Sequence, residues 1–277
     1  MLGKPGGWRP ANNRLSSNAQ TIVQRLISTS VTRLSTCGNQ VENGSYDGAM
    51  PVPARIAIIA ALPREIAGLV RGTEADASLV RDGVWLYRVE RAVVVAAGMG
   101  AERAAVAVEA ALWVGEEVEM LISTGLAGGC VPGVEVGSVM EAGVVADVAT
   151  GERFVAGVGS GVTLATADAI ASVAEKAGLA ERFGASMVDM EAATVARIAL
   201  AKGVGFRAIK GVSDGYEFEL SALARFEGER GNFRTGAFAA YTAVRPWTWR
   251  KAIELGRGSA KALAALEVVL RGVVAEG

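Results

Sequence analysis

Histidine is absent from the 277-residue sequence. Its absence excludes triads of Ser, His and Asp, pairs of Cys and His, and nearly all catalytic zinc sites, because each of these uses imidazole as a base or a ligand. Acid–base chemistry in this chain therefore falls to carboxylates, lysine, tyrosine or cysteine.

Cysteine is scarce. Cys37 and Cys130 are the two in the chain, and they lie far apart and outside any metal-ligand spacing. This usage indicates a reducing compartment rather than a disulfide framework. We expect a cytoplasmic protein with no metal site.

Long apolar runs are missing as well. The best run, residues 92–101, is short and contains two glycines, whereas a membrane-spanning helix needs roughly 20 apolar residues. The charges nearly cancel, with 28 Lys and Arg against 29 Asp and Glu, so no overall field favours nucleic acid or an anionic membrane. We expect a globular protein that binds a small molecule, without nucleic acid and without stable membrane insertion.

The N-terminal segment, residues 1–50, differs in composition from the rest. It is rich in Asn, Ser, Thr and Gly and has no acidic residue before Glu42. We predict a disordered or spurious extension, with Met50 as an alternative start. A targeting peptide stays open, although the segment lacks an apolar core. Residues 51–277 are predicted to form a single domain.

From Arg55 onward, short apolar runs that end in glycine or a charge alternate with Ala-rich helical stretches. Strands are predicted at 55–62, 92–100, 119–129 and 203–215, hairpin-like strands at 133–148, and helices at 63–72, 101–114, 168–184 and 245–273. Strands that are apolar on both faces and alternate with helices indicate a parallel sheet covered by helices. We predict an α/β fold with three layers, αβα, around a central, twisted, mixed and mostly parallel sheet.

Ligands of such folds bind at the carboxyl ends of the strands. Four motifs end there, at residues 60–65, 97–100, 124–129 and 213–215. Ala97, Gly98 and Gly125 in these turns are predicted to contact the substrate, since glycine permits close approach of a ligand or backbone. A purely structural turn is the alternative. The run GMGAER has Arg103 in place of the third glycine of a dinucleotide fingerprint, which disfavours a dehydrogenase.

Four carboxylates stand near predicted element ends. Glu65 suits the first turn of a helix, and Asp214, in the run SDG, suits a turn. Asp189 and Glu191 stand at the start of an apolar helix, with no basic residue nearer to Glu191 than Arg197. Glu191 is therefore harder to explain by local structure alone.

Five segments carry a resemblance to a known family: IAIIAALPREI, VVAAGMGAERAA, LISTGLAGG, VDMEAATVARIA and IKGVSDG. In order and approximate spacing, over residues 55–216, they resemble the nucleoside phosphorylase superfamily, and in particular the methylthioadenosine/S-adenosylhomocysteine nucleosidases. The resemblance implies a nucleoside phosphorylase-like fold, a nucleoside substrate, no cofactor, and a homodimer or larger homo-oligomer.

The implied reaction, cleavage of an N-glycosidic bond, passes through a ribosyl cation and needs a proton for the departing base and a nucleophile. By resemblance, Asp214 protonates purine N7 while Ser213 steadies its loop. Glu191 binds the ribose hydroxyls and Met190 packs on the sugar. Glu65 activates the attacking water.

Two residues depart from the family pattern. Asp189 replaces a glutamate common in nucleosidases and is predicted to cap or support the helix. Ile170 falls near the position from which the family stacks an aromatic ring on the base, and we include it among the substrate contacts.

Phosphate as the nucleophile stays open beside water. Phosphorylases of the superfamily hold phosphate with arginine and serine where this chain has Ser123 and Leu126. Arg64 and Arg103 are alternatives, although both are predicted to be helix-surface arginines. The resemblance therefore favours hydrolysis over phosphorolysis.

The C-terminal segments FELSALARF, FRTGAFAAY and RPWTW resemble hopanoid-associated phosphorylases. That resemblance implies an alternative function in hopanoid biosynthesis, the phosphorolytic or hydrolytic removal of adenine from adenosylhopane. With a lipid-linked substrate, the aromatic residues of these segments are expected to line an apolar channel for the lipid tail. The alternative is that they pack against the core or form a subunit interface. They are Phe226, Phe233, Phe238, Tyr241, Trp247 and Trp249. A non-catalytic nucleoside-binding domain is a third hypothesis, disfavoured by the full set of Glu65, Glu191 and Asp214.

Overall fold

The computed structural model describes residues 55–276 except residues 81, 116, 158–159, 227, 229–233 and 244. The predictions made for residues 1–50 and for Phe233 lie outside the described residues.

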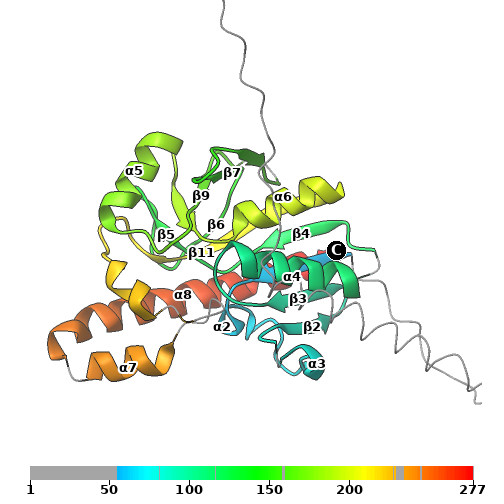
Figure 1. The fold of residues 1–277 in the computed structure, drawn as a ribbon, viewed down its shortest axis with the longest axis horizontal. Helices are drawn as coiled ribbons and strands as arrows, with labels where there is room; N and C mark the ends of the chain where they lie inside the picture. Colours follow the sequence, from blue (N-terminus) through cyan, green and yellow to red (C-terminus); the bar gives the residue numbers. More distant parts are fainter. Residues whose placement is uncertain are drawn as a thin grey trace, which may run out of the picture.

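A single large sheet forms the middle of the molecule (Figure 1). Its strands are β1 (Ile56–Ala60), β2 (Trp85–Val89), β3 (Ala92–Ala96), β4 (Met120–Ser123), β5 (Leu126–Gly129), β6 (Val139–Glu141), β7 (Val144–Asp147), β8 (Arg153–Val155), β9 (Thr163–Thr166), β10 (Met187–Asp189) and β11 (Gly205–Asp214). Their order in space is β2-β3-β1-β4-β11-β5-β10-β9-β7-β8, and β6 pairs with β11. Six pairings between the described strands are parallel and four are antiparallel, so the mixed, mostly parallel sheet is confirmed.

Strand β11 joins the two halves of this sheet. Its first half pairs with β4 and its second half pairs with β5, both in parallel. The strand therefore runs through the centre of the fold and ends at Ser213 and Asp214.

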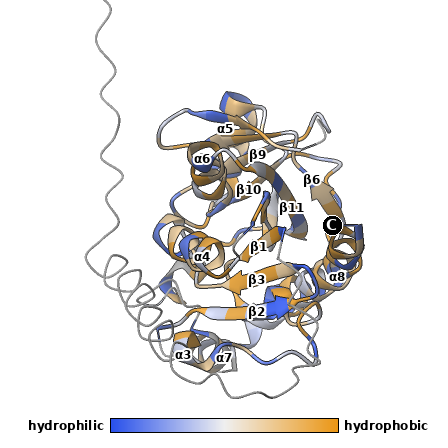
Figure 2. Ribbon diagram, turned by 90° about the vertical axis from the view of Figure 1, so that its right-hand side faces the viewer, coloured by the Kyte–Doolittle hydropathy of each residue, from blue (hydrophilic) through white to orange (hydrophobic). Residues whose placement is uncertain are grey.

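Helices cover both faces of the sheet (Figure 2). They are α2 (Pro63–Ile66), α3 (Ala77–Val80), α4 (Ala101–Val114), α5 (Val173–Phe183), α6 (Ala192–Lys202), η2 (Ser221–Phe226), α7 (Thr235–Ala243) and α8 (Pro246–Glu276). Strand β1 shows the layering, because Ala57 and Ile59 belong to the core under α4 and α6, whereas Ile58 packs with Leu266 and Leu270 of α8. Burial of apolar side chains on both faces of one strand is what a three-layer fold requires.

The ends of helix α5 follow from the local sequence. Ser172 caps its first turn in a capping box with Glu175, and the helix stops at Gly184, whose φ of 66° is in the left-handed region. These caps set the helix so that Lys176 and Leu179 share its buried face.

Three local predictions need correction. Residues 119–129 were predicted as one strand that runs into a glycine turn, but the turn at Gly125, with a φ of 115°, is followed by a second strand, β5. Residues 133–148 do not form a hairpin, since β6 pairs with β11 and β7 pairs with β8 and β9. Helix α2 has four residues and is followed by turns, in a stretch that holds two poor helix formers, Gly68 and Gly72.

Crossing a membrane requires a long apolar helix, and none of the helices in the described part of the chain meets that requirement.

Candidate active site

A cavity of about 460 Å³ opens at the carboxyl ends of the central strands and is closed on one side by α8. Six of the nine predicted site residues line it: Glu65, Ile170, Met190, Glu191, Ser213 and Asp214. Ala97, Gly98 and Gly125 are not among the described lining residues, and Met99 lines the cavity next to them in sequence. The same two turns contribute to the wall through other residues, Met99 and Leu126 to Gly128.

Glu65 is held at the rim by three backbone donors. Its Oε2 accepts hydrogen bonds from the N–H groups of Ala61 at 3.1 Å and Leu62 at 2.9 Å, and its Oε1 accepts one from Leu126 at 3.2 Å. Three such donors fix the orientation of a carboxylate and stabilise its charge. Gly125 leaves room for this arrangement, because a Cβ added there would lie 2.8 Å from Glu65 Oε2.

Asp189 is part of the scaffold, as predicted, but it ends strand β10 rather than sharing a helix with Glu191. Its Oδ2 accepts from the N–H of Ala192, the first residue of α6, at 3.0 Å. The same atom pairs with the fully buried Lys210 Nζ at 2.8 Å. Although burial acts to lower it, the pKa of Lys210 is raised by the carboxylates of Asp189 and Glu191. Lys210 therefore stays charged beneath the cavity.

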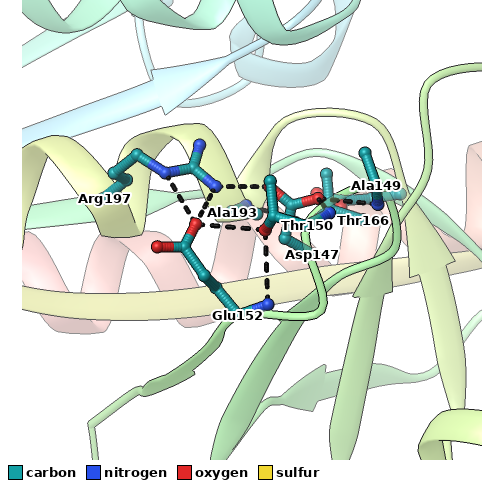
Figure 3. A network of polar contacts seen from close by, with 8 residues as sticks. Asp147, Ala149, Thr150, Glu152, Thr166, Ala193 and Arg197 are labelled. Carbon is teal, nitrogen blue, oxygen red and sulfur yellow. Dashed lines mark hydrogen bonds and ion pairs between the residues drawn. The ribbon is translucent and has the colours of Figure 1, made fainter. Parts of the chain in front are cut away.

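Thr166 and Arg197 extend this scaffold toward the surface (Figure 3). Thr166 Oγ1 donates to Asp189 at 2.7 Å and accepts from the N–H of Ala193 at 3.0 Å. On the next turn of α6, Arg197 forms ion pairs with Asp147 and with Glu152. The start of α6, which carries Glu191, is thereby tied to the strands beside it.

Glu191 is the N-cap residue of α6, yet its side chain does not cap that helix. Its Oε1 instead accepts from the N–H of Gly100, at the start of α4, at 2.8 Å. Burial and, next, the nearby Asp189 carboxylate raise the pKa of Glu191 to about 7. The group thus changes charge near neutral pH.

This raised pKa has a testable effect on stability. Between the ordinary value near 4.5 and about 7, the folded state holds more protons than the unfolded state, so the free energy of unfolding falls as pH rises through that window. Glu191→Gln removes the titration. From pH 5 to pH 8, we expect the free energy of unfolding of wild type to fall by on the order of 2 kcal/mol more than that of the variant. Urea unfolding at the two pH values measures the difference.

Glu181→Gln, on an exposed position of α5, serves as the matched control and should show no such change. A stability difference between Glu191→Gln and wild type that is the same at both pH values would contradict the assignment.

Asp214 is engaged through both carboxylate oxygens. Ser213 Oγ donates to Oδ1 at 2.5 Å, and Lys176 Nζ forms an ion pair with Oδ2. The Asp214 and Lys176 side chains are each 1% exposed, and both residues line the cavity.

Sequence reasoning missed Lys176. The signal that could have found it is a lysine three residues before Leu179, on the apolar face of a predicted helix, where an unpaired charge would be costly. Such a lysine needs a buried acidic partner, and Asp214 is that partner.

Part of the cavity wall is apolar. Leu220 and Leu223 of the η2 region, Phe238 of α7, and Leu255 and Leu263 of α8 contribute to it. These side chains come from the C-terminal third of the chain and line the cavity on the side of α8.

Of the aromatic residues predicted for a lipid channel, Phe238 lines the cavity. Phe226 packs edge-on against Phe238 and Tyr241, with ring centroids 5.4 and 5.3 Å apart. Trp247 and Trp249 are exposed, at 75% and 48%. The described part of the wall is therefore mostly aliphatic. Of the predicted aromatic residues, only Phe238 is among its described members.

The prediction that Arg103 is a helix-surface arginine was wrong. Arg103 is 6% exposed, and it donates to the carbonyl groups of Ala97, Asp82 and Gly83. It braces the turn after β3 and is not among the described lining residues. Arg64 is exposed and lines the cavity rim.

Several solved structures share this fold. The apo 5'-methylthioadenosine nucleosidase of Arabidopsis thaliana superposes with a TM-score of 0.61 at 18% identity, over 80% of this chain and 95% of that one. The futalosine hydrolase of Helicobacter pylori gives 0.58 at 15% identity, over 80% and 97%. The 5'-methylthioadenosine/S-adenosylhomocysteine nucleosidase of Helicobacter pylori, with butyl-thio-DADMe-Immucillin-A, gives 0.57 at 14% identity, over 80% and 98%. At such identities the likeness shows the fold.

No curated protein matches the chain. The sequence does match the family model of the Phosphorylase superfamily, over residues 55–157 and 142–240. These two spans cover more than half of the chain. The protein is therefore an enzyme of the phosphorylase superfamily, which cleaves the N-glycosidic bond of nucleosides with water or with phosphate.

Proposed function

We propose that the protein cleaves the N-glycosidic bond of an adenine nucleoside with water as the nucleophile. The observation that carries this proposal is the meeting of Glu65, Glu191 and Asp214 on one cavity, each with different partners. Carboxylates in different surroundings can take different roles in one reaction.

Each acid is assigned one task. Asp214, steadied by Ser213, delivers the proton to N7 of the departing base. Glu191 binds the ribose hydroxyls while Met190 packs on the sugar, and the ionised form of Glu191 is the better acceptor for hydroxyl groups. Glu65 takes a proton from the attacking water. No cofactor is needed for these steps.

Water is favoured over phosphate by the charges at the cavity. Among the described lining residues, the cationic side chains are Arg64 and Lys176, and Lys176 is paired with Asp214. A bound phosphate needs charge-assisted donors close together. The fixed Glu65 carboxylate at the rim suits a general base for water and would repel a phosphate dianion.

The apolar wall favours a second candidate substrate. A nucleoside with a hydrophobic 5' substituent, such as a methylthio group or the lipid of adenosylhopane, buries that substituent against Leu223, Phe238 and Leu255. Removal of adenine from adenosylhopane, by water or by phosphate, is therefore the alternative function. A cytoplasmic location and a homodimer or larger homo-oligomer stay predictions.

The test is release of free base by the purified protein. Methylthioadenosine, S-adenosylhomocysteine, adenosine and inosine are incubated with and without phosphate, and the base is separated by chromatography. We expect adenine release without phosphate, and we expect Glu65→Gln to lower that rate by about 10²- to 10⁴-fold through loss of the general base.

Gly125→Ala tests the same step without changing Glu65 itself, because the added Cβ displaces the Glu65 carboxylate. Its rate should fall in parallel with that of Glu65→Gln. Release that depends on phosphate would overturn hydrolysis, and release only from an adenine nucleoside with an alkyl 5' substituent would favour the lipid-linked substrate.

A further inference from the structure

Lys176 uses all of its donors inside the protein. Its ammonium group pairs with Asp214 Oδ2 and donates to the carbonyl oxygens of Gly215 at 2.9 Å and Phe218 at 3.2 Å. A lysine has three N–H donors, so none is left over. Lys176 thereby ties helix α5 to the end of β11 and to the loop that follows it.

On the side of strand β5 there is little space beside this pair. A Cβ added to Gly128 of β5 would lie 3.0 Å from Asp214 Oδ2 and 3.2 Å from Lys176 Cε. The two charged groups are therefore held together by the backbone of the neighbouring strand as well as by each other.

The pairing raises a problem for proton delivery. Asp214 accepts hydrogen bonds at both oxygens, from Ser213 Oγ and from Lys176 Nζ. In a pair with an ammonium group, the proton stays on the amine rather than on the carboxyl group, because lysine is much the weaker acid. The proton that the departing base needs must then come from a donor in contact with Asp214, and the ammonium group of Lys176 is in contact with it.

We propose that Lys176 and Asp214 form one proton-delivery unit, in which Lys176 is a positioning residue that fixes the Asp214 carboxylate and passes its proton through it to the departing base. This inference rests on the proposed function. It adds to that function the source of the proton and the reason for a fully buried lysine at the cavity.

The protons and electrons balance as follows. The bond between ribose C1' and purine N9 breaks, and its electron pair goes to the base. A proton moves from Lys176 Nζ to Asp214 Oδ2 and from Asp214 to N7, which leaves Lys176 neutral. Glu65 takes one proton from the water whose oxygen bonds to C1'. After the products leave, Glu65 loses its proton to solvent and Lys176 regains one, so the net change is the consumption of one water.

Arginine at position 176 separates proton transfer from simple positioning. Arginine keeps the positive charge and can pair with Asp214, but it does not release a proton in proteins. We expect Lys176→Arg to lower kcat/KM for adenosine by about 10²-fold or more. Lys176→Met removes both charge and proton and should lose at least as much, and Lys202→Met, at an exposed position of α6, is the matched control.

The readout that a structural defect would not reproduce is dependence on the leaving group. Adenosine and 6-chloropurine riboside share the sugar and the purine frame, but chlorine withdraws electrons, so the second base leaves with less help from a proton. The loss caused by Lys176→Arg and by Lys176→Met should therefore be at least about tenfold larger for adenosine than for 6-chloropurine riboside.

Equal losses for both substrates would overturn the proton-delivery unit. Near-normal turnover by Lys176→Arg would also overturn it, because arginine can position Asp214 but cannot donate a proton. Wild-type protein that releases base from none of adenosine, 6-chloropurine riboside, methylthioadenosine and S-adenosylhomocysteine would overturn the proposed function and the proton-delivery unit together. If wild type releases base and the variants lose equal activity on both substrates, the proton-delivery unit is contradicted and the proposed function is not.

Discussion

Asp214→Asn is expected to lower kcat/KM for base release by about 10²- to 10⁴-fold. Asparagine has nearly the same shape, and its amide oxygen can accept the hydrogen bond from Ser213 Oγ. It cannot carry a proton to N7, however, so the base must leave with its electron pair unneutralised. The measurement is steady-state release of adenine from the best substrate, with wild type assayed alongside.

The control separates lost chemistry from lost structure. Lys176 keeps its bonds to the carbonyl groups of Gly215 and Phe218 in the variant but loses its anionic partner. We therefore expect a folded protein with a lower free energy of unfolding, checked by circular dichroism and by a cooperative thermal transition. Asp168→Asn, at an exposed position in the loop beside the cavity, should keep near-normal activity. Near-normal turnover by Asp214→Asn would remove that residue from proton delivery.

Lys210→Met is expected to lower the free energy of unfolding by about 3 to 5 kcal/mol. Lys210 and Asp189 have side chains that are each 0% exposed, with Nζ and Oδ2 2.8 Å apart. Breaking one side of such a pair leaves the other charge buried without compensation, and the cost exceeds the worth of the pair itself. Urea unfolding at neutral pH measures the change.

A double variant tests whether the cost comes from the stranded carboxylate. Lys210→Met combined with Asp189→Asn removes both charges and should recover part of the lost stability. Lys202→Met, on the exposed end of α6, should change it by less than about 0.5 kcal/mol. A cost below about 1 kcal/mol for Lys210→Met would mean that the pair is not important to the scaffold.

The two acids of the run VDMEAA show how a pattern is resolved by the fold. In the sequence, Asp189 and Glu191 differ little in setting. In the structure, Asp189 ends a strand and is bonded by Thr166, Ala192 and Lys210, while Glu191 turns away from its own helix toward Gly100. Both residues line the cavity, but the Asp189 carboxylate is bound to the scaffold while the Glu191 carboxylate is not, because the chain changes from strand to helix between them.

The strand ends were predictable for a general reason. Apolar runs followed by glycine or acid mark buried parallel strands and the loops after them, and in such sheets these loops converge on one edge. That rule placed Glu65 and Asp214 at one edge, whereas Glu191 was assigned to the site by the family resemblance; the three line one cavity. It did not predict β9 and β10, whose short sequences, TLAT and MVD, carry no clear strand pattern.

By itself, the sequence determined the layered α/β fold and the acids at its ligand-binding edge, because hydrophobic periodicity and turn residues act over a few neighbouring positions. Only the tertiary structure decided that Lys176 pairs with Asp214, that Arg103 is buried, and that α8 closes the cavity. Each of these joins elements that are distant in the chain, and such contacts depend on packing between whole elements rather than on local pattern.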